Sequence, residues 1–451
     1  MGLSTFMGLE TSLRGLLAQQ QALDTTSHNI ANASTTGYSR QVAVFQASPA
    51  YTMPGVTTAP AGPGQIGTGV DVAGYQRIRD AFLDVQYRAQ TMLQGQAQAN
   101  QDGLQQVQLA FNEPTDSGIS SLLSNYWGAW QNLSNNPEDM GTRQALAQSA
   151  ASLADGFQSL SSQLTTLQSQ TAQNVIDQIN QVNNLGTQIA QLNLTISKIT
   201  ATGNSPNDLL DQRDLLVDQL SALGNVAVTN GVNGSVDISF GGASLVTAGT
   251  SATLAESDLT GLSAGKIQGL ITLRDTTIPG YQTQLNTIAS TLITKTNAQS
   301  AAGFDLNGNA GGAFFTGTDA TNITVNPALV SNPALIAASA TGAVGDAGNA
   351  LKMADMQTTP TIGAATIDAA YTQLVTQVGA DVQQATNQVD TTTALTNALQ
   401  NQRQSVSGVS LDEEMTNLIT FQRGYQASAR ALSAMDDMLD QLINRTGRVG
   451  L

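Results

Sequence analysis

Three oxygen-bearing side chains alternate in the stretch FDLNGNAGGAFF, where Asp305, Asn307 and Asn309 occupy every second position. Alternating carboxylate and amide oxygens are typical of calcium loops, which wrap about 12 residues around the ion. Counted from Asp305, however, the sixth position is Ala310 where such a loop needs glycine, and the twelfth is Thr316 where it needs glutamate. We therefore predict an Asx-turn supported by glycines, and no metal site.

A second candidate is the group Asp211, Arg213 and Asp214, which has the residue types of an acid–base cluster. On a helix this spacing more simply gives a solvated or salt-bridged face, and that is our interpretation. His28 is the only histidine and there is no cysteine, so a catalytic triad or an imidazole metal site would have to centre on one residue. We interpret His28 as a polar residue on a helix face. No catalytic residue, no cofactor and no metal are predicted.

The composition excludes several classes of partner. Seventeen basic against 33 acidic residues give a net charge of -16, which repels nucleic acid and anionic membrane surfaces. Only 11% of residues are charged, so the surface must rely on Gln, Asn, Ser and Thr, and such a surface suits packing against copies or partners. No apolar run approaches the length of a membrane span, and no cleavable signal peptide is apparent. We expect no nucleic acid, no membrane partner, and an export route that reads another signal.

The first and last helix patterns each carry one apolar stripe. In the first helix, predicted over residues 4–33, the stripe recurs every seven residues at Leu9, Leu16, Leu23 and Ile30. In the last helix, predicted from residue 409, the stripe and its companion are Leu411, Leu418, Phe421, Tyr425, Leu432 and Leu439. Because neither stripe has another nearby core, we predict that the two helices pair as a coiled coil and that neighbouring copies cover the rest. The alternative is that both helices join an ordinary bundle.

Between these helices the patterns predict a rod. Candidate strands over 41–45 and 69–73 lie in a stretch rich in Gly, Pro, Val and Thr. Apolar residues then recur at steps of three and four without proline from 140 to 200, and a continuous helix of about 55 residues would span roughly 80 Å. A helix over 206–223 precedes a β-hairpin over 226–240, which contains Asn-Gly turn signals. The predicted fold class is mainly α and elongated, with several domains.

The N-terminal sequence SLRGLLAQQQALDTTSHNIANASTTGYSRQ resembles the signature shared by flagellar rod, hook and hook-associated axial proteins. In that family a helix runs into N-I-A-N-A-N-T-x-G-Y, and this chain departs at Ser34, where asparagine is usual, while keeping a turn-forming side chain. The continuation Ser39-Arg40-Gln41 and three later blocks are similar to members at the junction of hook and filament: PNDLLDQRDLLVDQLS, NAQSAAGFDLNGNAGGAFF and GVSLDEEMTNLITFQRGYQASARAL. The matches follow the family's order over nearly the whole chain.

The resemblance implies paired terminal coiled-coil helices, a long helical-bundle rod and a small β-containing outer domain. The implied units are a terminal-helix core domain (1–35 with 408–451), a helical rod domain with an extended N-terminal segment (36–222, 266–302 and 366–407), and a small β-rich outer domain (223–265 with 303–365). The signature would form a corner where the first helix leaves the core. There Asn29 and Asn32 would bond helix-end or turn groups, Gly37 would adopt a conformation other residues resist, and Tyr38 would pack.

The function implied by the resemblance is that of a structural adaptor, which joins hook to filament by polymerising as a short helical layer. Its expected partners are copies of itself, the flagellar hook protein, the second hook–filament junction protein, and an export chaperone on the C-terminal helix. It would be extracellular, on the bacterial flagellum, after export through the flagellar type III secretion channel. Two alternatives stay open, namely another axial protein such as a hook or rod subunit, and a secreted coiled-coil effector or translocator.

Overall fold

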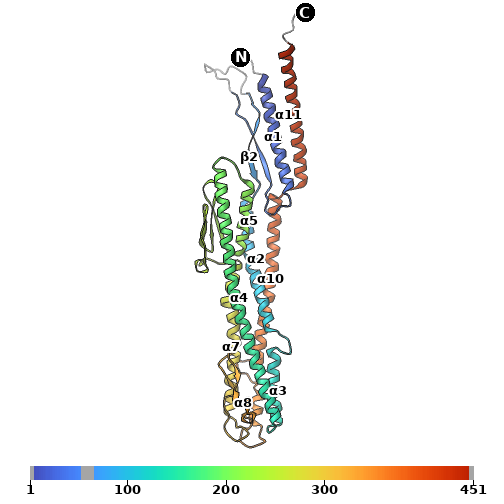
Figure 1. The fold of residues 1–451 in the computed structure, drawn as a ribbon. Helices are drawn as coiled ribbons and strands as arrows, with labels where there is room; N and C mark the ends of the chain where they lie inside the picture. The colour runs from blue at the N-terminus through green and yellow to red at the C-terminus, as the bar shows by residue number, and fades with distance from the viewer. Residues whose placement is uncertain (1–4, 52–65, 446–451) are drawn as a thin grey trace, which may run out of the picture.

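The computed structural model describes residues 5–51 and 66–445, and it forms a long rod (Figure 1). Helices α1 (Thr5–Ala31) and α11 (Leu411–Arg445) lie side by side at one end, while the short helix α8 (Pro327–Ser331) lies at the opposite tip. The predicted fold class, elongated and mainly helical, is confirmed. No helix within the described ranges is long and apolar enough to cross a membrane.

A bundle of long helices forms the shaft of the rod (Figure 1). Its helices are α2 (Ala81–Phe111), α3 (Ile119–Asn135), α4 (Met140–Thr200), α5 (Asn207–Leu223), α6 (Lys266–Thr272), α7 (Ile278–Ala301), α9 (Gly348–Asp355) and α10 (Ile367–Ser407). A π-helical turn, η3 (Leu273–Thr277), joins α6 to α7.

Helix α4 is one unbroken helix of 61 residues, which confirms the uninterrupted helix predicted over 140–200. It begins where the side chain of Asp139 accepts a hydrogen bond from the Thr142 amide, a good N-cap. Its buried residues recur at steps of three and four, so one face stays covered along the whole length. Pro114 lies in the segment that separates α2 from α3.

Two hydrophobic clusters fill the shaft, and α4 contributes to both. The distal cluster, toward the tip, includes the buried rings of Tyr126, Trp127 and Trp130 together with Phe157 of α4. The proximal cluster, nearer the terminal helices, includes Val182 of α4 and apolar residues of α5, α6 and a small sheet. The two clusters follow one another along α4, so the shaft has two apolar cores, with the buried polar Thr171 of α4 between Leu167 of the distal cluster and Val175 of the proximal one.

The strands form three small antiparallel sheets. Strands β1 (Gln41–Ala47) and β2 (Val70–Arg77) pair as the predicted extended segment beside the terminal helices. The predicted hairpin is present as β3 (Val226–Asn230) and β4 (Val236–Phe240), and β5 (Ala243–Thr247) with β6 (Thr250–Ser251) completes a four-stranded meander. The third sheet pairs β7 (Phe315–Thr316) with β8 (Thr324–Val325).

The predicted grouping of 223–265 with 303–365 as one outer domain is wrong. The meander within 223–265 packs on the second half of α4 through residues of the proximal cluster. The segment 303–365 instead inserts Phe314 and Ile336 into the distal cluster, because the aromatic residues of α3 offer these side chains an apolar partner there. The other domain boundaries stay a prediction. The predicted core domain also extends into residues 1–4 and 446–451, which lie outside the described residues.

Candidate assembly interface and corner

Helices α1 and α11 run antiparallel and approach closely through small residues of α1. A Cβ atom on Gly8 would lie 2.8 Å from Met435 Cε, and one on Gly15 would lie 3.1 Å from Ser428 Oγ. Ala22 continues the same row after another seven residues and is only 1% exposed. The two helices therefore touch along a row of small residues, each of which precedes one leucine of the predicted stripe.

The predicted stripe residues lie at the edges of this contact. Leu9, Leu16, Leu23 and Ile30 of α1 are half-buried, as are Leu418, Phe421, Tyr425 and Leu432 of α11, and Leu439 is buried. Leu411 is 55% exposed, so the structure does not place it in the seam predicted for it. The first turn of α11 instead meets α1 through Glu414, which accepts a hydrogen bond from Asn29.

Apolar side chains also project from the helix pair toward solvent. Leu13 and Leu17, one turn apart on α1, are 40% and 48% exposed. Met415 and Ile419, one turn apart on α11, are exposed as well. The helices bury the faces that they turn to each other and to strands β1 and β2, where Phe45 meets Phe421. Among the described residues, a single copy therefore leaves a further apolar face of both helices exposed.

Asn29 ties together the elements that meet at the corner. Its side-chain nitrogen donates to the carbonyl of Gln41 at 2.8 Å and to Glu414 Oε2 at 3.1 Å. Its oxygen accepts from the amide of Gln41 at 3.0 Å and from the hydroxyl of Tyr38 at 2.7 Å. One buried amide therefore links α1 to β1 and to α11, and a fully bonded buried polar residue favours one register of a helix pair.

The other predicted corner residues, Asn32, Gly37 and Tyr38, follow the end of α1. Asn32 donates to the carbonyl of His28 at the end of α1, at 3.0 Å. Gly37 has a φ of 83°, in the left-handed region that favours glycine. The ring of Tyr38 meets that of His28 edge-on with the centroids 5.5 Å apart. His28 lies on the helix face, with its Nε2 3.4 Å from Asp208 Oδ1.

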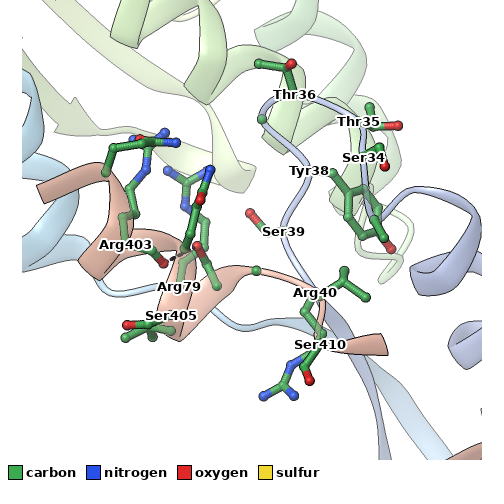
Figure 2. Close-up of a pocket in the computed structure, with 18 of the residues that line it drawn as sticks. Ser34, Thr35, Thr36, Tyr38, Ser39, Arg40, Arg79, Arg403, Ser405 and Ser410 are labelled. Atoms are coloured by element: carbon green, nitrogen blue, oxygen red, sulfur yellow. Dashed lines mark hydrogen bonds between the residues drawn. The ribbon is translucent and has the colours of Figure 1, made fainter. Parts of the chain in front are cut away.

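Beyond Tyr38 the chain is bound to the shaft. Ser39 donates to Asp211 through its amide at 2.9 Å and through its hydroxyl at 2.8 Å. The amide of Arg40 donates to the carbonyl of Ser407 at 2.9 Å, and its guanidinium pairs with Glu413. This loop and the join between α10 and α11 line an open cavity of about 530 Å³. Figure 2 shows residues that line it.

An ionic cluster lies beside the corner. Its members are Arg77, Arg79, Arg88, Arg403, Asp84, Asp211, Asp214 and Asp218. Arg79 pairs with Asp84 at 2.7 Å and with Asp214 at 3.0 Å, and Arg403 reaches Asp218 at 2.7 Å. The formal charges balance, and the cluster joins the end of β2 to α2, α5 and α10. It thereby fixes the corner to the shaft.

The α5 group predicted as a solvated or salt-bridged face is salt-bridged and largely buried. Asp211 and Asp214 pair with the arginines of the ionic cluster, and the solvated alternative is wrong for them. Arg213 points to another side of α5, where it donates to Asn193 Oδ1 at 3.1 Å and to the carbonyl of Gly234. Burial and the neighbouring arginines lower the pKa of Arg213.

Burial and nearby charges at the corner also shift the pKa values of Tyr38 and Asp214. Burial, followed by the charges of nearby carboxylates, raises the pKa of Tyr38 well above its ordinary value, so its hydroxyl stays protonated and can donate to Asn29. Burial alone would raise the pKa of Asp214, but the guanidiniums of Arg79 and Arg77 hold that pKa below its ordinary value. Asp214 is therefore charged at neutral pH.

Sequence reasoning missed most of this cluster. Asp211, Asp214 and Asp218 are spaced by three and four, which places them on one face of α5 and could have signalled a shared set of partners. The arginines come from three other elements, and no local spacing connects them to α5. Glu414, only 2% exposed beside Asn29, was missed for the same reason.

The calcium-like loop contains the predicted Asx-turn. Asp305 Oδ1 accepts from the amides of Asn307 and Asn309, both at 2.8 Å, so this carboxylate is bonded to its own loop. Within the part of the chain that the structure describes, no group of three or more His, Cys, Asp or Glu residues has the arrangement of a metal site.

Three family models match successive parts of the chain. The one described as the flagellar hook-associated protein FlgK helical domain matches residues 104–315. A model described as flagella basal body rod protein matches 9–38, and one described as flagellar basal body rod FlgEFG protein C-terminal matches 405–445. The two rod-protein matches therefore fall on α1 with its corner and on α11.

Relatives match the chain from end to end. Flagellar hook-associated protein 1 of Bacillus subtilis (strain 168) is 34% identical over 98% of this chain and 99% of that protein. Flagellar hook-associated protein 1 of Escherichia coli (strain K12) is 28% identical over 97% and 99%. The solved flagellar hook junction protein FlgK from Burkholderia pseudomallei is similar in fold, with a TM-score of 0.61 at 19% identity over 71% of this chain and all of that one. By its sequence, this chain belongs to the flagellar hook-associated protein 1 family.

Proposed function

We propose that this chain is a structural adaptor of the bacterial flagellum, which polymerises as a short helical layer and joins hook to filament. Full-length relatives are named as flagellar hook-associated proteins, and a protein of similar fold is named as a hook junction protein. The observation that carries the proposal is the apolar surface that the α1–α11 pair leaves uncovered. Only neighbouring subunits offer a matching surface for two helices at the end of a rod.

The assembly interface consists of the stripe residues at the edges of the helix pair together with the exposed apolar residues beside them. In a layer, the α1–α11 pairs of successive copies gather side by side, and each pair covers the face that the previous one leaves exposed. Burying one leucine of this kind is worth about 1.5–3 kcal/mol, so a few such contacts per copy suffice to drive assembly.

The corner and the ionic cluster give the adaptor its stiffness. Asn29 fixes the helix pair to β1, and the ionic cluster fixes β2, α2, α5 and α10 to one another. A load applied to the terminal helices therefore passes into the shaft through buried, mutually bonded groups. The role is structural and needs no catalytic group.

The expected partners follow from this arrangement. One face of the layer contacts the flagellar hook protein, and the other contacts the second hook–filament junction protein. Before export through the flagellar type III secretion channel, a chaperone shields α11, whose exposed Met415 and Ile419 would otherwise meet water or other chains.

The test replaces Leu13 and Leu17 by aspartate in a bacterium that lacks its own copy of the gene. Because both side chains are exposed in the monomer, the purified variant should unfold at the same temperature as the wild type. Isolated hooks should lack the variant, and filaments should be absent. The control is Gln21→Asp on the same helix, which adds a charge at an exposed polar site and should leave filaments normal. Normal filaments in the double variant would refute the proposal.

A further inference from the structure

The two apolar cores of the shaft adjoin at one level, which we call the waist. On α4, Leu167 belongs to the distal cluster and Val175 to the proximal one, and the buried Thr171 lies one turn from each. Its hydroxyl donates to the carbonyl of Leu167, in its own helix, at 2.8 Å. The row of apolar contacts along α4 is therefore interrupted at the waist, by a kind of bond that often bends helices.

A π-helical turn lies at the same level. After η3, the amide of Ile278 donates to the carbonyl of Leu273, five residues back. Pro279 follows and has no amide hydrogen, so the next bond of this kind, to the carbonyl of Arg274, cannot form. Gln168 of α4 donates to that carbonyl instead, at 3.0 Å. A π-helical turn and a proline are two of the identified causes of helix kinks.

Helices α2 and α10 carry small or polar side chains at the waist. On α2, Gly103 is so close to η3 that a Cβ atom there would lie 2.0 Å from Leu273 Cδ2. On α10, the buried residues from Ala385 onward are Ala385, Thr392 and Thr396. A cavity of about 300 Å³ lies between α2, η3 and α10. Since empty space offers no dispersion contacts, little packing holds these helices in one fixed arrangement here.

Hydrogen bonds place these features opposite one another. Gln101 of α2 donates to Thr386 Oγ1 of α10 at 3.1 Å, and the bond of Gln168 to the carbonyl of Arg274 connects α4 to η3. Leu273 lines the cavity. The interruption therefore involves α2, α4, η3 and α10, and it runs through the cross-section of the shaft.

The shaft is well packed on both sides of the waist. On the distal side the rings of Tyr126 and Trp130 are fully buried, and on the proximal side Val182 and Phe240 are fully buried. Close-packed cores resist deformation. The shaft thus consists of two stiff halves joined at a level where packing is weaker.

We propose that the waist is a joint, at which the distal and proximal halves of the shaft tilt relative to each other while each half keeps its own core. This property belongs to a single copy and does not depend on polymerisation. In the proposed layer, the joint lets the tip of the rod shift while α1 and α11 stay in contact with neighbouring copies.

The first test measures distances across the waist in the purified full chain by double electron–electron resonance. The chain has no cysteine, so two introduced thiols carry all the spin labels. Exposed sites for the labels are Thr247→Cys on the meander and Thr287→Cys on α7. Both elements pack on α4, roughly 10 Å from its axis, so a tilt of about 20° changes the distance between the labels by roughly 4 Å.

Two control pairs each stay within one half of the shaft. They are Gln144→Cys with Thr287→Cys in the distal half, and Gln181→Cys with Thr247→Cys in the proximal half, all at exposed sites. The distance distribution across the waist should be wider than both control distributions by roughly 4 Å. Equal widths for all three pairs would overturn the proposal.

The second test makes the apolar row of α4 continuous. Thr171→Val replaces a hydroxyl by a methyl group and so connects Leu167 to Val175, which should narrow the distribution across the waist toward the controls. The matched control is Thr166→Val, because Thr166 is exposed and makes the same kind of bond, to the carbonyl of Ser162 at 2.9 Å. It should leave the width unchanged. An unchanged width in the Thr171→Val chain, or equal narrowing by Thr166→Val, would overturn the assignment of the joint to the waist.

Discussion

Replacing Asn29 by alanine should release the terminal helices from the corner. The side chain is 1% exposed and makes four hydrogen bonds, to the amide and carbonyl of Gln41, to Glu414 and to the hydroxyl of Tyr38. Each buried group left without a partner costs about 1–3 kcal/mol, and a carboxylate such as Glu414 lies at the upper end. Water can enter the space left by the amide and replace some of the lost hydrogen bonds. We therefore expect the free energy of unfolding to fall by about 3–5 kcal/mol.

Amide hydrogen exchange can show which helices lose stability in this variant. Since Asn29 connects α1 to β1 and α11, exchange should accelerate in α1 and α11 by at least about 100-fold, up to the rate of an open chain, and stay unchanged in α4. The control is Asn32→Ala, which removes one bond to the carbonyl of His28 at a half-exposed site and should accelerate exchange less than about tenfold.

Two results would refute this reasoning. Unchanged exchange in α11 of the Asn29→Ala variant would mean that the amide does not hold the helix pair in place. Equal acceleration in α4 would mean that the corner and the shaft unfold as one unit, and that the bonds of Asn29 have no local role.

Other changes test the ionic cluster and the packing of the shaft. Arg79→Met leaves the buried ionic cluster with one more negative than positive charge and should cost about 3–5 kcal/mol in urea unfolding. Arg274→Met, whose partners are more exposed, should cost about 1 kcal/mol or less. The pKa of Asp214 in the folded protein lies below its unfolded value of 3.8. The stabilisation that its carboxylate contributes is therefore present above pH 3.8 and is lost as the pH falls through the folded pKa. Asp214→Asn should accordingly reduce the difference in unfolding free energy between pH 7 and pH 3. Gly103→Ala, where a Cβ would overlap a leucine of η3, should lower the melting temperature, and Gly128→Ala, in open space on α3, should leave it equal or higher.

Local patterns predicted the elements because they depend on neighbours in sequence. The steps of three and four without proline required one helix over 140–200, and Asn-Gly turns with alternating apolar residues required the hairpin. The Asx-turn at Asp305 and the left-handed Gly37 follow from the same short-range chemistry. The resemblance in the NIANASTTGYSR stretch added the corner. The residue pattern alone could not distinguish this corner from an ordinary helix-to-strand loop.

The sequence by itself determined the helices, their apolar stripes and the acidic face of α5, because each depends on the period of a single element. Only the tertiary structure decided that α1 meets α11 along Gly8, Gly15 and Ala22, one position before the leucines. It also decided that 303–365 packs at the tip, and that the aspartates of α5 pair with arginines from β2, α2 and α10. These contacts join segments that are up to hundreds of residues apart in the sequence. Small residues let two helix backbones approach closely, and this close packing selects one contact face among several that look equivalent in the sequence of a single helix.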